Sequence, residues 1–491
     1  MYFRVDDSCY APNLRLSCVS PSNLLGRLNN ALRRVCLGLL VAMVMCVASA
    51  CAALPDVSGL GSSGTPSGPA QSPTVVGAKG EISAKSSRSL LSQRWKNSYA
   101  DTKVLAQLEE IATTKPLIAG NKLTLLHDGP ETMAAMLEAV RTAKNHINLE
   151  TYIFEQDAVG IAFADLLIEK QRSGVPVHII VDSVGIISTP SIFFERMRDA
   201  GISILEFNPI NPLKLLGPWE PNNRDHRKIL VVDGVVAFTG GVNISSTYAN
   251  SSLFRSKGRK STKVGWRDTH IKIEGPAVAA LQWEFLNNWI QHQAPNLADS
   301  NFFPPLAPQG NQLVRVLASE PDGDPEIYKS YILAINLAKT TVHITSAYFV
   351  PDLQILNALT NAATRGVSVK LVLPGVKENG LAYFAGQSYF SEMLGSGIRI
   401  FQLQESVLHA KTAVIDSLWS TVGSANIDTR SFLHNYELNL MVYDPVLGNA
   451  MESAFQEDLR LSKEVDRSEW ETRPTSDKLK QWFAQRLGYW L

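Results

Sequence analysis

One spacing of residues occurs twice in the chain, and this repetition limits the folds that the chain can adopt. The copies lie in "NRDHRKILVVDGVVAFTGGVN" (223–243) and "HAKTAVIDSLWSTVGSAN" (409–426). Both read His-x-Lys-x4-Asp, and both continue to Gly-[Gly/Ser]-x-Asn. A single copy fits a strand, a turn and an ordinary packed histidine. Two copies with the same downstream residues indicate an internal duplication. The matched residues are His226, Lys228, Asp233 and Asn243 in the first copy, and His409, Lys411, Asp416 and Asn426 in the second.

The duplication extends beyond this motif. The stretch "AKNHINLETYIF" (143–154) corresponds to "AKTTVHITSAYF" (338–349), and "GISILEF" (201–207) corresponds to "GIRIFQL" (397–403). Each half alternates amphipathic helices with short strands rich in Val and Ile, which is typical of sheets covered on both faces. The sequence therefore predicts an α/β fold with two repeated αβ domains, each a mixed central sheet flanked by helices. We expect these domains to pack about a pseudo-twofold axis.

Composition divides the chain into five parts. Residues 1–54 hold a basic stretch and an apolar segment, and residues 55–117 form a Gly/Ser/Pro-rich tether with a lead-in. The repeats are expected at 118–300 and 313–491, with a linker at 301–312 in a region rich in Pro and Asn. All five cysteines lie in the first 51 residues, so the repeats hold no disulfide and no cysteine-based metal site.

The two motifs predict a shared site if the halves pack about that axis. This site holds two imidazoles, two ammonium groups and two asparagine amides. Imidazole serves as a nucleophile or a proton carrier near neutral pH, and Lys and Asn donate hydrogen bonds to phosphoryl oxygens. The sequence has no evident carboxylate cluster of the kind that binds Mg²⁺, so we expect neither a metal nor a cofactor. A formal net charge of zero argues against nucleic acid as a partner.

The duplicated motif resembles that of the phospholipase D superfamily over residues 118–491. Four further stretches are similar to bacterial cardiolipin synthases: "INLETYIFEQDAVG" (147–160), "WRDTHIKIEGPAV" (266–278), "AYFVPD" (347–352) and "GSANIDTRSFLHNYELNL" (423–440). The resemblance implies a phosphatidyltransferase that converts two phosphatidylglycerol molecules to cardiolipin and glycerol through a phosphohistidine, at the surface of an anionic bilayer. The alternative is a phospholipase D-type hydrolase of phospholipids or, less in keeping with the charge, of nucleic acid. The sequence leaves open whether water or a lipid alcohol resolves the intermediate, and which alcohol it is.

The resemblance also implies roles for the motif residues. His226 attacks phosphorus, and His409 protonates the departing glycerol and then deprotonates the incoming hydroxyl. Asp233 and Asp416 support the site from behind. The residues that hold the phosphoryl oxygens are then Lys228, Lys411, Asn243 and Asn426.

Two carboxylates are candidates for orienting the histidines. Glu437 lies on the strand-like run that follows the second motif, so we expect it to hold the His409 ring. Asp268 occupies the corresponding place in the first half, displaced by an insertion that contains the basic stretch 255–263. This stretch is expected either to face solvent or to attract anionic lipid.

The apolar run 35–54 holds twenty residues without a charge, which is long enough to span a bilayer. Arg27, Arg33 and Arg34 precede it. It also resembles a lipoprotein signal, which makes Cys51 a candidate lipid anchor. Whether the segment is cleaved, lipidated or kept as a span stays open. By the positive-inside rule, we expect a protein of the bacterial cell membrane whose catalytic domains face outward, on the periplasmic side.

Overall fold

The computed structural model describes residues 53–60, 72–211, 220–248, 265–292, 297–376 and 380–488. Cys51, the basic stretch 255–263 and nearly all of the apolar run 35–54 lie outside these residues. Within the described part of the chain, no helix is both long enough and apolar enough to cross a membrane.

The two repeats share the order of their main elements, and the second repeat contains additional short strands and helices. In the first repeat they are β3 (Leu117–Leu126), α4 (Gly129–Thr142), β4 (Ile147–Thr151), α5 (Ala158–Arg172), β5 (Val177–Asp182), α6 (Ser191–Asp199), β6 (Ser203–Phe207), β7 (Arg224–Asp225), β8 (Ile229–Val232), β9 (Val236–Gly240), β10 (Trp266–Arg267), β11 (His270–Glu274) and α7 (Val278–Gln291). In the second repeat they are β12 (Gln312–Ser319), α8 (Glu326–Leu337), β13 (Thr341–Ser346), β14 (Phe349–Val350), α9 (Leu353–Thr364), β15 (Ser368–Pro374), α10 (Gly380–Gln387), α11 (Phe390–Gly395), β16 (Arg399–Leu403), β17 (Val407–Leu408), β18 (Lys411–Ile415), β19 (Trp419–Gly423), β20 (Ile427–Asp428), α12 (Thr429–Leu433), β21 (Asn435–Tyr443) and α13 (Pro445–Arg460). The chain continues through β22 (Ser462–Glu464), α14 (Arg467–Glu471) and α15 (Thr475–Arg486).

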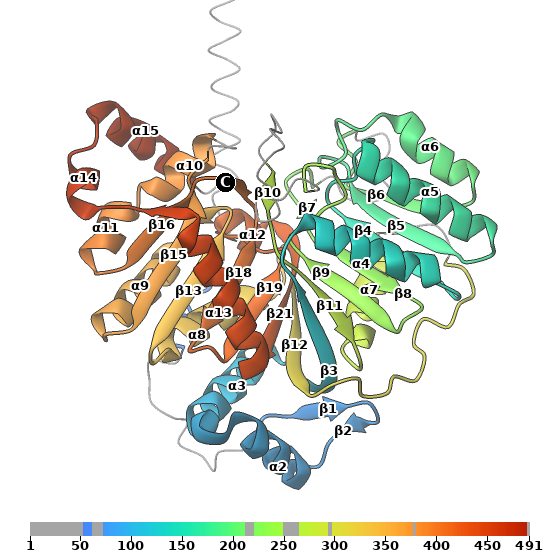
Figure 1. Cartoon of the computed structure of the whole chain (residues 1–491), viewed down its shortest axis with the longest axis horizontal. Coiled ribbons are helices and arrows are strands. Elements are labelled where there is room, and N and C mark those ends of the chain that lie inside the picture. Colours follow the sequence, from blue (N-terminus) through green and yellow to red (C-terminus); the bar gives the residue numbers. More distant parts are fainter. Residues whose placement is uncertain are drawn as a thin grey trace, which may run out of the picture. The chain divides into compact units, whose positions relative to one another are not determined.

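The main strands of both repeats join in one sheet, whereas β10 with β17 and β14 with β20 form separate two-stranded sheets. Strand pairing gives the order β6-β5-β4-β8-β9-β11-β3 in the first half and β12-β21-β19-β18-β13-β15-β16 in the second, with β3 antiparallel to β12. The second order is the first one reversed, strand for equivalent strand. An antiparallel pair of equivalent strands has local twofold symmetry, so the predicted pseudo-twofold arrangement is confirmed (Figure 1).

The parallel strands of each half lie between helices and are buried on both faces. All residues of β4 and β5 are buried, as the Val- and Ile-rich runs predict. The helices that follow equivalent strands begin in the same way. The Asp157 carboxylate accepts hydrogen bonds from the first backbone N–H groups of α5, and Asp352 does so for α9. These caps fix the helix starts at the carboxyl ends of the parallel strands.

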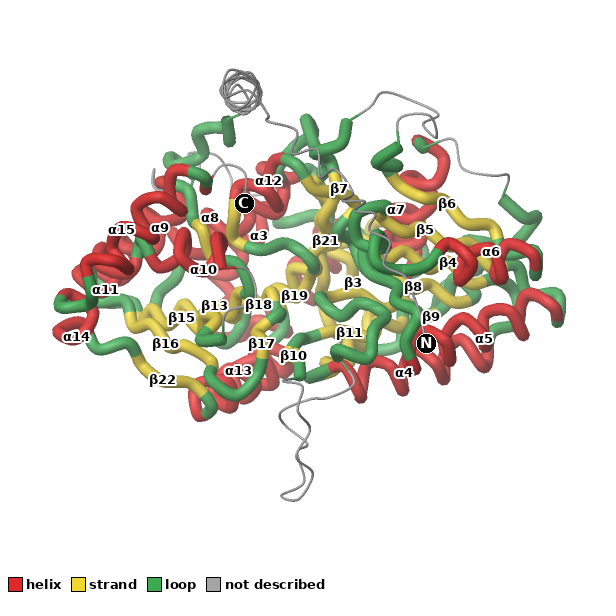
Figure 2. The backbone as a smooth tube through the Cα atoms, turned by 90° about the horizontal axis from the view of Figure 1, so that it is seen from above, coloured by secondary structure: helices red, strands yellow, loops and turns green. Residues whose placement is uncertain are grey.

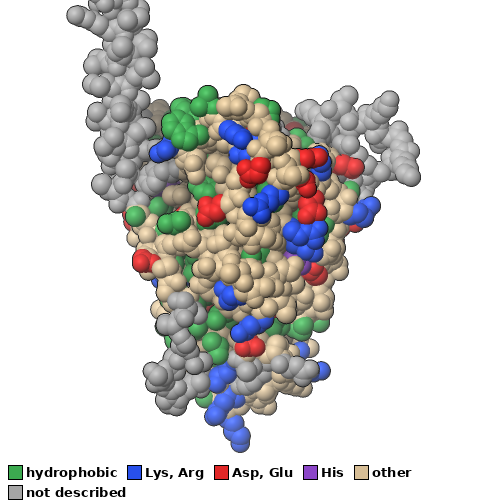
Figure 3. Space-filling view, turned by 90° about the vertical axis from the view of Figure 1, so that its left-hand side faces the viewer, with side chains coloured by type: hydrophobic (Ala, Val, Ile, Leu, Met, Phe, Trp, Pro, Cys, Tyr) green, Lys and Arg blue, Asp and Glu red, His purple; other side chains and the backbone are tan. Residues whose placement is uncertain are grey.

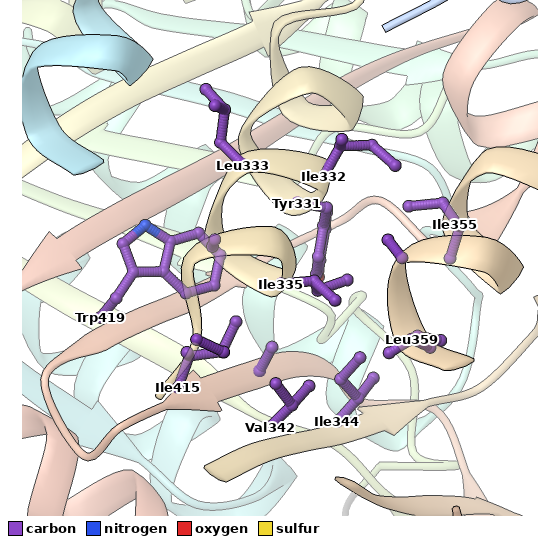
Figure 4. Packing of buried hydrophobic residues seen from close by; sticks show 14 of the residues in the cluster. Tyr331, Ile332, Leu333, Ile335, Val342, Ile344, Ile355, Leu359, Ile415 and Trp419 are labelled. Carbon is purple, nitrogen blue, oxygen red and sulfur yellow. The ribbon is translucent and has the colours of Figure 1, made fainter. Parts of the chain in front are cut away.

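Helix α8 forms the centre of the second half's core (Figure 4). Its Tyr331 and Ile335 pack against Ile344 of β13 and Ile415 of β18, all at most 2% exposed. Burial of each such side chain contributes roughly 1.5–3 kcal/mol to folding. This packing holds β13 and β18 in place, and β18 carries the central part of the second motif.

The lead-in to the first repeat contains elements that the sequence analysis did not identify. They are β1 (Val75–Gly77), β2 (Gly80–Glu81), α2 (Ala84–Trp95) and α3 (Tyr99–Thr113). Glu109 of α3 is fully buried, pairs with Arg315, and accepts hydrogen bonds from Tyr443 (2.6 Å) and Trp419 (3.3 Å). The lead-in is therefore tied to the second repeat by a buried charged network.

Candidate active site

Each motif histidine is fixed by the half of the molecule to which it does not belong. His226 follows β7, and its backbone N–H donates to the carbonyl of Tyr436 (3.0 Å) in β21. His409 follows β17, and its N–H donates to the carbonyl of Arg267 (2.8 Å) in β10. The short parallel pairs β7–β21 and β10–β17 make these crossings equivalent under the pseudo-twofold axis. Figure 2 shows β7 beside β21 and β10 beside β17, both pairs in the middle of the molecule.

The two histidines line one cavity of about 370 Å³. Tyr152 and Tyr348, which come from the matched stretches 143–154 and 338–349, lie on its wall. The other lining residues include Ile153, Arg224, Trp266, Val350, Ala382, Asn426, Asp428, Arg430, Ser431 and Asn435. The structure therefore brings the two motif histidines to a single site.

The orienting carboxylates are crossed between the halves, which corrects the expected pairing. Both carboxylate oxygens of Glu437 lie 3.1 Å from Nδ1 of His226, and Oδ2 of Asp268 lies 2.7 Å from Nδ1 of His409. The prediction that Glu437 holds the His409 ring is wrong. Glu437 follows His409 in sequence, but β21 pairs with β7, so its neighbour in space is the first histidine.

Glu437 is fully buried among hydrogen-bond donors. Besides His226, Oγ of Ser424 donates to its Oε2 (2.5 Å) and Nδ2 of Asn435 donates to its Oε1 (3.1 Å). Burial alone would raise the pKa of Glu437, but His226, Lys228 and Ser424 hold it at about 2. An ionised carboxylate only accepts hydrogen bonds, so Nδ1 of His226 carries the proton and Nε2 keeps its lone pair.

Asp268 has a different environment. Burial raises its pKa to about 6, although Lys411 and the backbone N–H of Thr269 favour the ionised form. The Cβ of any larger residue at Gly241 would come within 2.1 Å of its Oδ1, so the motif glycine leaves room for this carboxylate. Ser424 occupies the matching place in the second motif and donates to Glu437 instead.

Both histidines have a lowered pKa. Burial lowers the pKa of His226, an effect opposed by Glu437. Burial and then the charges of Lys411 and Lys228 lower the pKa of His409 well below its ordinary range. Both imidazoles are therefore expected to be neutral at neutral pH unless an anion binds beside them.

The motif lysines lie beside their own histidines. Lys228 donates to the carbonyl of His226, and Lys411 donates to the carbonyl of His409. Nζ of Lys411 is also 3.1 Å from Nδ1 of His409. Burial lowers the pKa of Lys228 to about 7, although Glu437 opposes this shift. An anion in the cavity would restore the full charge of this lysine.

The two motif asparagines differ. Asn426 lines the cavity, and its buried Oδ1 has no hydrogen-bond partner within the described structure. Asn243 does not line the cavity; its amide donates to the hydroxyl of Tyr248 (2.8 Å) and accepts from the backbone of Ile153 (3.1 Å). The Tyr248 hydroxyl lies 3.3 Å from Nδ1 of His409. Asn243 is therefore placed to orient His409 through Tyr248.

The motif aspartates lie away from the cavity, at the hairpin that ends each motif strand. Asp233 accepts hydrogen bonds from the backbone N–H groups of residues 144–146, and Asp416 accepts from those of residues 339–341. Both aspartates have positive φ angles, 56° and 54°, which Asp tolerates better than most residues. Each one locks the hairpin of its motif to the start of a parallel strand.

Sequence analysis missed two arginines on the cavity wall. Arg224 is 3% exposed, and its Nη1 contacts Asp182 (3.4 Å), while Nε and Nη2 have no hydrogen-bond partner within the described residues. Arg430 is half-buried and donates to Asn222. Their closeness to the motifs in sequence could have identified them, because Arg224 lies two residues before His226 and Arg430 lies four residues after Asn426. Across the described chain, no group of three or more His, Cys, Asp or Glu side chains is placed to hold a metal ion.

Comparison with known proteins agrees with this geometry. The family model described as "Cardiolipin synthase, PLD-like domain" matches residues 136–253 and 331–459. The chain is 34% identical to the major cardiolipin synthase ClsA of Bacillus subtilis over 75% of each chain. It is also 34% identical to a cardiolipin synthase of Geobacillus thermodenitrificans, covering 73% of this chain and 70% of the relative.

Among solved structures, the phosphatidylserine synthase of Haemophilus influenzae matches with a TM-score of 0.57. The match covers 78% of this chain and 99% of that chain at 15% identity. At this level of identity the likeness supports the fold alone.

Proposed function

This chain belongs to the cardiolipin synthase family of phospholipase D-like proteins, and from that premise we propose that it joins two phosphatidylglycerol molecules to give cardiolipin and glycerol. The observation that carries the proposal is the pair of histidines on one cavity, each with Nδ1 held by a carboxylate of the other half. This pairing leaves two Nε2 atoms for one phosphodiester, as a double displacement requires.

In the first step, Nε2 of His226 attacks phosphorus and the bond from phosphorus to the glycerol oxygen breaks. The ionised Glu437 stabilises the positive charge that develops on the ring. Lys228, Lys411 and Asn426 donate hydrogen bonds to the phosphoryl oxygens, while Asn243 acts through Tyr248. Asp233 and Asp416 hold the two motif hairpins in register.

His409 is the proton carrier in this proposal. Its pKa is lowered by burial and by the charges of two lysines, and a bound phosphodiester anion compensates those cations and raises the pKa. The protonated ring then donates to the leaving glycerol oxygen. In the second step it takes the proton of the incoming hydroxyl, whose oxygen bonds to phosphorus as the bond to His226 breaks.

We infer that the acceptor is a second phosphatidylglycerol. Such an acceptor brings its own phosphodiester, which must lie in the cavity beside the reacting one. Arg224 and Arg430 place two guanidinium groups on that wall, and guanidinium pairs well with phosphate oxygens. Water or a neutral alcohol would have no use for these charges.

The test is product identification. The full-length protein in vesicles of labelled phosphatidylglycerol is expected to release glycerol and form cardiolipin in equal amounts. Phosphatidic acid as the main product would establish the hydrolase instead. If a protein shown to be folded forms neither product, the proposed function is contradicted.

We also propose that the segment 35–54 anchors the protein to the bacterial cell membrane with the catalytic domains outside. The three arginines before this segment and the absence of Lys and Arg between it and Lys79 support this orientation. A reporter active only outside the cytoplasm, fused after Leu491, is expected to be active. Activity of a cytoplasmic reporter at the same place would reverse the orientation.

A further inference from the structure

Helix α15 carries an apolar stripe on its exposed side. Leu479, Trp482 and Phe483 are 66%, 53% and 58% exposed. Their spacing of three and four residues places them on one face of the helix, a pattern that usually marks the face turned to the core. Here the core-facing side is a different one, formed by Gln481 and Ala484. The stripe is therefore an apolar surface without a covering element among the described residues.

The buried side of α15 packs against elements that line the catalytic cavity. Ala484 packs with Ala385 of α10 and with Val350, and Val350 lines the cavity together with Ala382 of α10. The side chains of Gln481 and Gln387 share a hydrogen bond of 3.1 Å across the same contact. Figure 2 shows α10 between α15 and the central strands. One layer of packing thus separates the stripe from the active site.

Cationic side chains flank the stripe. Lys478, Lys480 and Arg486 are exposed on α15, against the single carboxylate of Asp477. The guanidinium carbon of Arg486 lies 5.0 Å from the Trp482 ring centroid, and Nζ of Lys480 lies 5.4 Å from the Phe384 ring centroid. Figure 3, which views the side of the molecule with α14 and α15, shows hydrophobic side chains gathered at its upper end with Lys and Arg close by.

We propose that α15 is an interfacial membrane helix, which inserts Leu479, Trp482 and Phe483 at the boundary of headgroups and acyl chains in an anionic bilayer. Trp and Phe suit this depth, and flanking Lys and Arg reach anionic headgroups. A protein partner would not require that aromatic and cationic side chains alternate along one exposed helix.

The consequence concerns how lipid reaches the site. With α15 in the bilayer surface, α10 and the cavity wall that it forms lie at the headgroup level. A phosphatidylglycerol headgroup can then enter the cavity while its acyl chains stay among the lipids. This consequence rests on the proposed function, whereas insertion of the helix does not.

Insertion can be measured without turnover. The full-length protein, placed in vesicles of phosphatidylglycerol with brominated acyl chains, is expected to lose tryptophan fluorescence, and Trp482→Phe is expected to reduce the quenched fraction. Trp283→Phe is the matched control, because Trp283 is 59% exposed on α7, away from the α10–α15 contact. A quenched fraction unchanged by Trp482→Phe would overturn the proposal. The His226→Ala protein should show the same quenching as wild type, so loss of catalysis is separate from loss of insertion.

Kinetics give the second test. Trp482→Ser with Phe483→Ser is expected to lower the rate on phosphatidylglycerol vesicles about tenfold or more. The rate on a short-chain phosphatidylglycerol dissolved as monomers should stay within twofold of wild type. The control pair, Trp283→Ser with Ile290→Ser on α7, should alter neither rate. Equal losses of rate on both substrates would mean that the stripe supports the fold and would overturn the proposal. The proposal would also be overturned if the wild-type protein self-associates and the same pair of substitutions abolishes that association, because the stripe would then bind a second copy of the chain.

Discussion

Each half of the molecule places a copy of the same motif at one shared cavity, but the charged groups around the two motif histidines differ. His226 faces Glu437, whose pKa is held at about 2, whereas His409 faces Asp268, whose pKa is raised to about 6. The charge and hydrogen bond of His226 and the charge of Lys228 outweigh burial at Glu437, with a further hydrogen bond from Ser424, whereas burial outweighs Lys411 at Asp268. A duplicated motif has thus produced two unlike imidazoles. We assign the role of nucleophile to His226, whose partner Glu437 is ionised, and the role of proton carrier to His409, whose partner Asp268 has a pKa of about 6.

The largest expected effect removes either histidine. His226→Ala and His409→Ala should each lower cardiolipin formation by about 10⁴-fold or more, because both rings act in one double displacement. The measurement is radiolabelled cardiolipin from phosphatidylglycerol vesicles. His146→Ala is the matched control within the same half, since that buried ring contacts Asn145 and Gln282 rather than the cavity. Substantial turnover in either motif variant would show that the halves work independently.

Substitutions of the two orienting carboxylates should lower activity by different amounts. Glu437→Gln keeps the shape but removes the charge that stabilises the His226 imidazolium, and a loss of about 10³-fold is expected. Asp268→Asn should cost less, roughly 10- to 100-fold, because Tyr248 still contacts His409. Single-turnover kinetics should place the Glu437→Gln defect in adduct formation. Equal losses, or a larger loss for Asp268→Asn, would contradict the assignment of roles.

The pH dependence of kcat/KM should show the same asymmetry. We expect the rate to fall below about pH 6 as Asp268 is protonated, and to fall above about pH 7 as Lys228 loses its charge. Asp268→Asn should remove the acid limb, and Lys228→Arg should move the alkaline limb upward because guanidinium keeps its charge. If neither limb of the pH profile changes with these substitutions, Asp268 and Lys228 are not the groups whose titration controls kcat/KM.

Protonation of Asp268 or Glu437 does not explain that acid limb through unfolding. The raised pKa of Asp268 means that its ionisation opposes folding, so protonation near pH 6 stabilises the fold at this residue. The depressed pKa of Glu437 contributes stability that is lost only as pH falls from its ordinary value of 4.5 through about 2. Circular dichroism at pH 5 should therefore show a folded protein with low activity.

The smallest expected effect is that of chelation. Lys228 and Lys411 lie beside the two motif histidines and, in the proposed mechanism, supply the charge that a metal ion would otherwise provide, so exhaustive treatment with EDTA should change the rate by less than about twofold. The control is the same treatment of vesicles alone, to detect changes in the lipid surface. A strict requirement for Mg²⁺, restored by titration, would contradict the account.

Much of this comparison could be predicted from sequence. The spacing of His226 and His409 within matching repeats predicted one shared site, and the Val- and Ile-rich runs predicted the buried strands. These features are local, or they repeat, so a pattern can reveal them. The segments 84–95 and 99–113 were missed because their apolar spacing is weak, and they are held to the rest of the chain by the buried Glu109 network.

The pairing of carboxylates could not be predicted. Glu437 was assigned to His409 because the two are close in sequence, whereas the contact with His226 depends on how β21 meets β7. Arg224 and Arg430 were missed for a related reason. Each is an ordinary polar residue in its own half, and its place on the cavity wall follows only from the packing of the two halves.

The central claim is that the first histidine carries the intermediate and the second moves the proton. Phosphatidyl-p-nitrophenol with a labelled phosphatidyl group tests it directly, because this leaving group needs no proton. The account predicts that the His409→Ala protein accumulates a stable labelled adduct on the peptide containing His226, while the His226→Ala protein forms none. A labelled adduct on the His409 peptide of the His226→Ala protein, with none on the His409→Ala protein, would contradict it.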